Sequence, residues 1–185
     1  MPPKRAKPVA ATRHPTSEEI HFAVGEFYLG FLLAAFSAKG VVAIQIGNDS
    51  NRLLKELQTY FPKALLVRKE PAQEQRLKQV IHFVEEPAEG LDLPLDIRGT
   101  PFQLRVYKAV QNIPCGRFST YTDIARKIGS PKAMRAVGNA CSNNMLSIAI
   151  PCHRVLRNDD TPSGRRDWGS DRQRTLLSRE MTIPE

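Results

Sequence analysis

Features that would assign this chain to a special class of protein are missing from its sequence. No apolar run approaches the roughly 18 residues that a membrane-spanning helix needs. The opening segment, MPPKRAKPVAATRHP, contains no apolar core, so no secretory signal is indicated. Only three cysteines occur, an odd number without metal-ligand spacing, which favours a reducing, intracellular environment over a disulfide-stapled fold.

The composition is that of an ordinary globular protein with a basic bias. Hydrophobic residues make up 41% and charged residues 25% of the 185 residues, which excludes a wholly disordered or collagen-like chain. The net charge of +8 is unevenly spread, because residues 15–97 carry 8 basic and 12 acidic side chains whereas residues 98–185 carry 15 and 7. A basic half favours a polyanionic partner such as nucleic acid, although a solvated basic face would give the same composition.

The pattern of apolar residues divides the chain into three parts and predicts a mixed α/β (α+β) protein. Residues 1–16 are rich in Pro, Lys, Arg and Ala and are predicted to be a disordered basic tail. Residues 17–96 have the pattern of an N-terminal α/β domain, with strands expected at 20–27, 29–36, 41–46 and 65–67 and helices at 50–61 and 73–86. Ser50 is the expected N-cap of the first of these helices.

The third part, residues 97–185, contains the start and stop signals of several helices. Thr100-Pro101-Phe102-Gln103 combines an N-cap, a proline at the first helical position and a capping-box glutamine. Thr120 is the expected N-cap of a short second helix that Gly129 ends, and Ser130-Pro131 is expected to start the next helix at once. Two short helices joined by such a turn indicate a helix-turn-helix.

The second helix of this motif combines small residues with one long cation. Arg135 projects among small residues that let the helix backbone approach a partner surface closely, namely Ala133, Ala136, Gly138 and Ala140. Such a helix suits the minor groove of DNA, where one side chain enters the base stack. Ordinary close packing against another helix, with Arg135 in solvent, explains the composition equally well.

The segment Ile150-Pro151-Cys152-His153-Arg154 has the sharpest chemical signature. A cysteine beside Ile and Pro is by default an inert buried thiol. Here the proline ends any regular element just before Cys152, and the basic residues His153 and Arg154 favour the thiolate, which is the reactive form. Asn143 and Asn144 lie shortly upstream, in a loop whose side chains can brace this turn.

A nucleophile, a base and an orienting acid are therefore expected around Cys152. Adjacent residues of an extended segment point to opposite sides, so His153 would reach the thiol through a water molecule. A carboxylate must orient the imidazole, and Glu180, which follows Leu176 and Leu177 in a predicted C-terminal helix, is the candidate. Cys115 and Cys141 have no neighbouring base and are predicted to be structural thiols.

These segments resemble the O6-alkylguanine-DNA alkyltransferases, also called methylated-DNA–protein-cysteine methyltransferases. The resemblance lies in IPCHRV (150–155), NN (143–144), LLSRE (176–180) and the stretch from Gly99 to Asn144, and LPLDIRGTPFQ is most like the bacterial adaptive-response form. It implies a ribonuclease-H-like N-terminal domain (17–96) with a three-stranded sheet and helices, followed by a helical, winged-helix-like DNA-binding domain (97–185). It also implies a monomer without a cofactor that binds double-stranded DNA bearing O6-alkylguanine, and it leaves O4-alkylthymine open as a second lesion.

The resemblance also implies a role for individual residues. Cys152 matches the thiolate that accepts the alkyl group, and His153 matches the water-mediated base. Glu180 matches the carboxylate that polarises this base, and Asn144 the residue that braces the turn. Arg135 matches the finger residue that fills the base stack when the damaged nucleotide flips out. Tyr121 matches the residue that helps to rotate the flanking phosphate. The positions on the minor-groove helix match Ala133, Met134, Ala136 and Gly138. The implied reaction is an irreversible, stoichiometric transfer from guanine O6 to sulfur.

The sequence departs from the family pattern at two places. A pocket tyrosine usually follows a Ser-Gly pair, but here Ser163-Gly164 is followed by Arg165 at that place, and the segment from Arg165 to Gly169 has one extra residue. Arg165 or Trp168 is expected to contact the lesion in place of that tyrosine. No cysteine precedes Cys115, so the cysteine-containing zinc site of some members cannot form, and no metal site is expected.

Three other functions remain as alternatives. A non-enzymatic lesion-binding protein of the alkyltransferase-like type shares the docking domain but lacks the acceptor cysteine, which Cys152 supplies here. A helix-turn-helix transcription factor would prefer one DNA sequence irrespective of damage, and a Cys-His hydrolase would need an oxyanion-hole loop that the sequence does not show. The expected location is intracellular, in the cytoplasm or nucleoid of a bacterium or the nucleus of a eukaryote, without membrane association.

Overall fold

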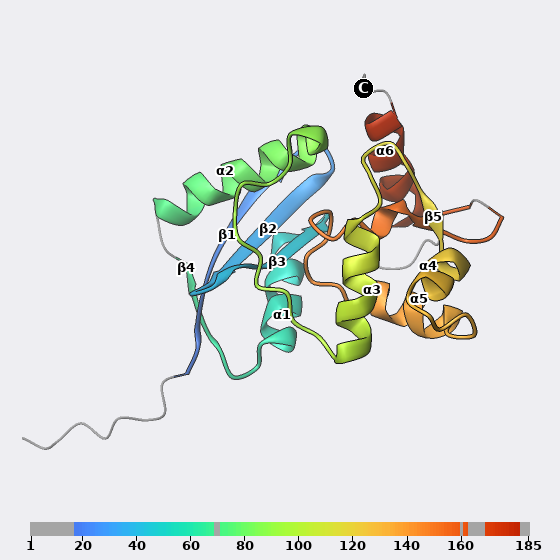
Figure 1. Cartoon of the computed structure of the whole chain (residues 1–185). Coiled ribbons are helices and arrows are strands. Elements are labelled where there is room, and N and C mark those ends of the chain that lie inside the picture. Colours follow the sequence, from blue (N-terminus) through green and yellow to red (C-terminus); the bar gives the residue numbers. More distant parts are fainter. Residues whose placement is uncertain (1–16, 69–70, 160, 163–168, 182–185) are drawn as a thin grey trace, which may run out of the picture.

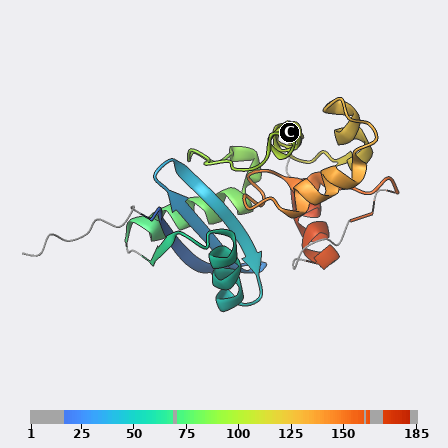
Figure 2. The same cartoon turned by 90° about the horizontal axis from the view of Figure 1, so that it is seen from below.

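The computed structural model describes residues 17–68, 71–159, 161–162 and 169–181. They form two lobes that lie side by side (Figures 1 and 2). The sheet lobe consists of the four-stranded sheet and the two helices that cover it, and the helical lobe consists of the described elements between residues 101 and 181. The predicted basic tail, residues 1–16, lies outside the described residues. Within the described ranges, no helix is both long and apolar enough to cross a membrane.

The sheet lobe is built on four strands. Strands β1 (Glu19–Phe27), β2 (Gly30–Ser37) and β3 (Gly40–Gly47) form an antiparallel meander, and β4 (Leu65–Arg68) pairs with β1 in parallel, which gives the order β3-β2-β1-β4. The mixed α/β class is confirmed. The expectation of a three-stranded sheet is wrong, because the chain crosses over through a helix after the meander and returns beside β1, as a parallel pair requires.

Two helices, α1 (Ser50–Tyr60) and α2 (Ala72–Glu85), cover opposite faces of this sheet (Figure 1). Successive strand residues point to opposite sides, so Leu33 packs with α1 and Ala34 with α2. The N-cap of α1 is Asp49 rather than Ser50, since the Asp49 carboxylate accepts hydrogen bonds from the first backbone N–H groups of the helix. A carboxylate at this place also complements the positive end of the helix dipole.

The short 3₁₀ turn η1 (Pro87–Glu89) leads into the helical lobe, whose elements are α3 (Pro101–Gln111), β5 (Ser119–Thr120), α4 (Tyr121–Lys127), α5 (Met134–Ser142), η2 (Cys152–Arg154), β6 (Val155–Leu156) and α6 (Gly169–Met181). The capping box of α3 is confirmed, because Thr100 and Gln103 exchange hydrogen bonds between their side chains and backbone N–H groups. Thr120 caps α4 as predicted. Strands β5 and β6 pair in parallel and bring the start of α4 to the segment that follows Cys152.

Helices α4 and α5 form the expected helix-turn-helix corner. Gly129 has a φ of +72° and, with Ser130, donates backbone hydrogen bonds to the carbonyls of Arg126 and Ala125 that close α4. Helix α5 does not begin at Ser130-Pro131 as expected. The N–H of Ala133 bonds to the carbonyl of Ser130 at 2.8 Å in a separate turn, so the helix begins three residues later, at Met134.

The two lobes join along the edge of β3. Val41 exchanges backbone hydrogen bonds of 2.8 Å with Pro94 and Asp96 of the linker. Ile44 donates to the carbonyl of Met145 at 2.7 Å and accepts from Ser147 at 3.1 Å, so the segment after α5 extends the sheet. One hydrophobic cluster also runs from β2 and α2 into α3, α5 and α6. The domain boundary at residues 96 and 97 stays a prediction.

Candidate active site

Cys152, His153 and Arg154 form the single 3₁₀ turn η2. The expectation of an extended segment is wrong, because the N–H of Arg154 bonds to the carbonyl of Pro151 at 2.9 Å and winds the chain. Successive side chains of a 3₁₀ helix are about 120° apart, so Cys152 and His153 still point in different directions. Cys152 is partly exposed whereas His153 is 2% exposed, so only the histidine is fully enclosed in the core.

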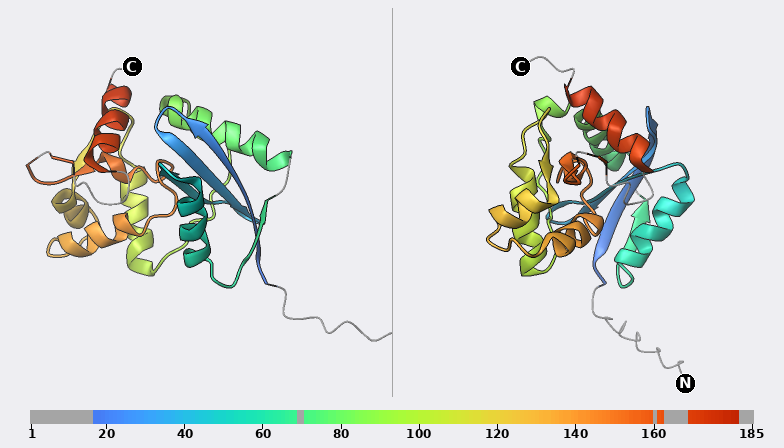
Figure 3. Two further views of the ribbon diagram at one scale, coloured as in Figure 1. Left: turned by 180° about the vertical axis from the view of Figure 1, so that it is seen from behind. Right: turned by 90° about the vertical axis from the view of Figure 1, so that its right-hand side faces the viewer.

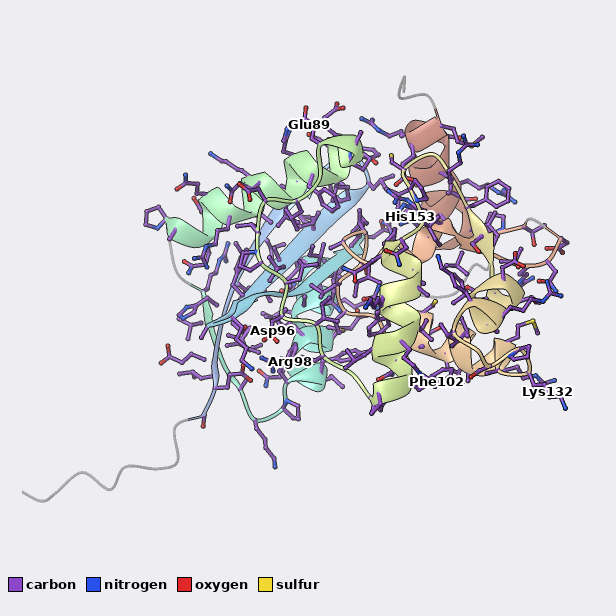
Figure 4. The ribbon with its side chains drawn as sticks, viewed as in Figure 1. Glu89, Asp96, Arg98, Phe102, Lys132 and His153 are labelled. Carbon is purple, nitrogen blue, oxygen red and sulfur yellow. The ribbon has the colours of Figure 1, made fainter. Side chains whose placement is uncertain are left out.

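The carboxylate predicted to orient His153 is the one that the structure brings to it. His153 Nε2 lies 2.7 Å from Glu180 Oε1, and Figure 4 shows the imidazole against helix α6. Arg154 donates from Nε to Glu180 Oε2 at 2.8 Å and from Nη2 to Oε1 at 3.0 Å. Its Nη1 donates to the carbonyl of Ile113 at 2.7 Å. One acid therefore holds both basic residues of η2.

The electrostatics of this cluster favour an ionised Glu180. Burial alone would raise its pKa, but the hydrogen bonds from His153 and Arg154 lower the pKa of Glu180 to about 2. Because this carboxylate neutralises the charge of Arg154, the stabilisation of a Cys152 thiolate that was predicted from Arg154 is offset. His153 Nδ1 is buried and has no hydrogen-bond partner among the described residues.

Asn144 ties the Cys152 turn to the end of α5. Its side chain is 2% exposed, and its Oδ1 accepts from the N–H of Leu146 at 2.9 Å. Nδ2 donates to the carbonyl of Ile150 at 2.9 Å and lies 3.3 Å from Cys152 Sγ. Asn143 is exposed and bonds instead to the carbonyl of Asn139 and to Tyr60. Only the second asparagine of the predicted pair braces the turn.

The exposed side of α5 borders a pocket of about 410 Å³. Its lining comes from α4, α5 and the segment after β6, and consists of Tyr121, Met134, Arg135, Gly138, Arg157, Asn158 and Asp159. The predicted docking residues of the helix do not share one environment. Met134, Arg135 and Ala136 are exposed and Ala133 is partly exposed, whereas Gly138 is buried at the pocket wall.

Comparison with known proteins identifies the family. Residues 101–182 match the family model described as 6-O-methylguanine DNA methyltransferase, DNA binding domain. The inducible methylated-DNA–protein-cysteine methyltransferase of Bacillus subtilis is 34% identical over 161 residues, which cover 81% of this chain and 87% of that protein. The chain belongs to the methylated-DNA–protein-cysteine methyltransferase family. The resemblance seen in the sequence is thereby confirmed.

Two other members of the methyltransferase family show how the chain compares in length and fold. The bifunctional transcriptional activator/DNA repair enzyme Ada of Escherichia coli is 45% identical over 166 residues, which are 90% of this chain but 47% of Ada. The chain thus spans about half the length of that relative. The structure of Mycobacterium tuberculosis OGT in complex with DNA matches with a TM-score of 0.70 at 30% identity, over 88% of this chain and 93% of that one.

The remaining predictions from the family resemblance concern the pocket tyrosine, the other two cysteines and a metal site. Arg165 and Trp168 lie outside the described residues, so the replacement of the pocket tyrosine stays a prediction. Neither Cys115 nor Cys141 is in a disulfide bond, and burial together with the nearby Glu180 charge raises the pKa of Cys115. Within the described ranges, no group of three or more His, Cys, Asp or Glu side chains could hold a metal ion.

Two residues near Cys152 were not singled out from the sequence. Gln173 is 5% exposed and donates from Nε2 to the carbonyls of His153, at 2.9 Å, and Val155, at 3.4 Å. It precedes Leu176 and Glu180 by three and seven residues, so helical spacing alone could have placed it on the same face. Ile148 has a φ of +73°, which nothing in the sequence signals because β-branched residues disfavour it.

Proposed function

We propose that this protein repairs alkylated double-stranded DNA by moving the alkyl group from O6 of guanine to Sγ of Cys152. The relatives are named for transfer from methylated DNA to a protein cysteine, and this chain keeps a partly exposed cysteine in the matching segment. The observation that carries the proposal is the approach of Asn144 Nδ2 to Cys152 Sγ, at 3.3 Å, beside the buried His153–Glu180 pair. A donor next to sulfur stabilises the thiolate needed for attack.

The residues divide the chemistry as a nucleophile, a base and an orienting acid. His153 takes the thiol proton through a bridging water at Nδ1, and the ionised Glu180 stabilises the imidazolium that forms. The Cys152 thiolate attacks the alkyl carbon, so an S–C bond forms as the C–O6 bond breaks. The bonding electron pair stays on the guanine, which takes up a proton and is restored. The thioether on Cys152 is stable, so each protein molecule acts once.

The DNA must present a base that is out of the stack, because O6 inside a duplex is inaccessible to a thiolate. Extrusion costs a few kcal/mol, and Arg135, exposed on α5, is proposed to fill the vacated place. Tyr121 is proposed to turn the flanking phosphate, and Arg165 and Trp168 to contact the lesion. The minor-groove surface of α5 is proposed to consist of Ala133, Met134, Ala136 and Gly138. Phosphate contacts of the basic half add affinity that does not depend on sequence.

The proposal also concerns assembly and lesion range. We infer that the protein acts as a monomer, since one chain carries both the acceptor cysteine and the docking helix. We also infer that it acts in the compartment that contains the DNA of the cell. O4-alkylthymine places its alkyl group on a similar exocyclic oxygen, so it is proposed as a second, weaker substrate. Sedimentation with and without DNA tests the first inference, and competition between the two lesions tests the second.

The deciding experiment measures the mass of the protein after it meets damaged DNA. With duplex DNA containing one O6-methylguanine, we expect one methyl group on the peptide that contains Cys152 and none on those that contain Cys115 or Cys141. Cys152→Ala should bind the duplex and gain no methyl group. An unmodified Cys152 peptide would overturn the proposal, and binding without transfer would favour the lesion-binding alternative.

A further inference from the structure

Helix α6 contacts both lobes, and its two contact surfaces have different chemistry. Figure 3 (right) shows the helix between the sheet lobe and the other helices of the helical lobe. Toward the sheet lobe it presents two cations. The Arg172 guanidinium donates from Nε to the carbonyl of Leu29 at 3.0 Å and also bonds to Asn48 Oδ1, and Arg179 lies over the ring of Tyr28 at 4.3 Å.

The contact of Arg172 with the sheet lobe is buried and specific, unlike a pairing of two exposed side chains. The residue is 9% exposed and, among the described residues, no carboxylate pairs with it. Its acceptors are uncharged, and burial lowers the pKa of Arg172. Gly30, with a φ of +110°, makes the space: a Cβ there would lie 2.7 Å from the carbonyl oxygen of Gly47 and 3.4 Å from Arg172 Nη2. A planar guanidinium with fixed donor directions is held in one orientation by such acceptors.

Toward the active site, the same helix presents the groups that hold His153. Gln173, next in sequence to Arg172, donates to the carbonyls of His153 and Val155. Glu180 lies on the same face and binds both the imidazole of His153 and the guanidinium of Arg154. A helix rises about 1.5 Å and turns about 100° per residue, so any slip or rotation of α6 would move both groups together.

We propose that Arg172 is a positioning residue for alkyl transfer: by fixing α6 on the sheet lobe, it holds Gln173 and Glu180 in register with His153. This inference rests on the transfer to Cys152 proposed above. The sheet lobe then affects the reactivity of the Cys152 thiol through α6 and not through the docking helix α5. Arg172 touches neither the thiol nor the imidazole, so its effect passes entirely through α6.

The test compares Arg172→Met with Arg174→Met, a matched change on the same helix. The Arg174 side chain is 65% exposed and lies 3.9 Å from Asp171, its one ion-pair partner among the described residues. For each folded variant, single-turnover transfer from a methylated duplex at saturation gives the rate within the complex, and unmodified duplex gives the affinity. We expect Arg172→Met to lower the rate about 10- to 100-fold, as small misplacements of catalytic groups do, with unchanged affinity. Arg174→Met should change neither.

Conservative variants separate positioning from general stability. Arg172→Lys keeps the charge but not the planar fork, so its rate should lie between those of the wild type and Arg172→Met. If Arg172→Met does not fold, Asn48→Ala removes one acceptor and leaves the carbonyl of Leu29, and a smaller loss of rate with unchanged affinity is expected. Equal rates in the folded Arg172 and Arg174 variants, or a parallel loss of DNA affinity, would overturn the positioning role. Failure of the unsubstituted protein to alkylate Cys152 would instead overturn the proposed function itself.

Discussion

The imidazole Nε2 of His153 lies 2.7 Å from Oε1 of Glu180, and both side chains are almost completely withdrawn from solvent. Arg154 binds the same carboxylate through two nitrogens. The acid therefore serves two neighbours with different tasks, because the imidazole is proposed to take a proton whereas the guanidinium only balances charge. Substitution of Glu180 should affect both the reaction and the stability of the fold, and the two effects can be measured separately.

Glu180→Gln should slow alkyl transfer about a hundredfold or more, because the neutral amide neither stabilises an imidazolium nor fixes the ring tautomer. Single-turnover transfer from a methylated duplex measures this rate, and binding of unmodified duplex should be unchanged. Glu89→Gln is the matched control, since Glu89 Oε2 lies 2.8 Å from His82 Nε2 in an exposed pair, and Figure 4 shows Glu89 apart from His153. Equal rates in the two variants would contradict the proposed role of Glu180.

Acid should weaken the fold through the same carboxylate. The pKa of Glu180 is lowered to about 2 in the folded protein, against about 4.3 in an unfolded chain. A depressed pKa contributes stability that is complete above the unfolded value and is lost as the pH falls through the folded one, here from about pH 5 to pH 2. The loss amounts to about 3 kcal/mol. Urea unfolding of the wild type and Glu180→Gln measures it, and the difference between the two proteins should shrink across that window.

Helices α3 and α4 and the carboxylate on α6 were predictable because their signals are local. The capping residues Thr100 and Thr120 fix helix starts, and helical spacing puts Glu180 on one face with Leu176. The pairing of β4 with β1 and the attachment of Met145 to the edge of β3 depend on contacts between distant segments. Spacing within one segment cannot encode such contacts, so the sequence left them open.

Asn144→Asp should slow transfer about a hundredfold, which is typical of the loss of one donor at a developing or stabilised anion. The new carboxylate keeps the acceptor for the N–H of Leu146 but removes the donor 3.3 Å from Cys152 Sγ and adds a negative charge there. The rate at increasing pH measures the effect, because a thiol of raised pKa recovers as the solution becomes alkaline. Asn143→Asp, on the exposed neighbour, should react at the wild-type rate.

Arg135→Ala should reveal whether this cation acts on base extrusion. Filling the vacated stack matters only where a stack exists, so the variant should transfer slowly from duplex DNA and at the wild-type rate from a single-stranded lesion. Transfer from both substrates, measured at one fixed salt concentration, gives the comparison. Arg126→Ala, on the exposed side of α4, is the control for loss of one positive charge. An equal loss on both substrates would show that Arg135 serves binding alone.

At Ile148, substitution by glycine should destabilise the fold less than substitution by alanine, which is the reverse of the usual order. Its φ of +73° lies in the left-handed region, which costs an L-residue about 1–2 kcal/mol, while its side chain is 2% exposed in the loop before Cys152. Ile148→Ala and Ile148→Gly lose nearly the same packing, but only glycine escapes the backbone strain. Ile148→Gly should therefore be the more stable of the two by about 1 kcal/mol in urea unfolding.

The same pair of substitutions at Ile150 provides the control. Ile150 is 1% exposed and, unlike Ile148, is not among the non-glycine residues of positive φ in the described part of the chain. There the ordinary order should hold, with Ala more stable than Gly by about 0.5–1 kcal/mol. If Ile148→Gly were less stable than Ile148→Ala, the left-handed turn would not be present in solution. The loop that joins Asn144 to Cys152 would then need another explanation for the 3.3 Å approach of the amide to the thiol.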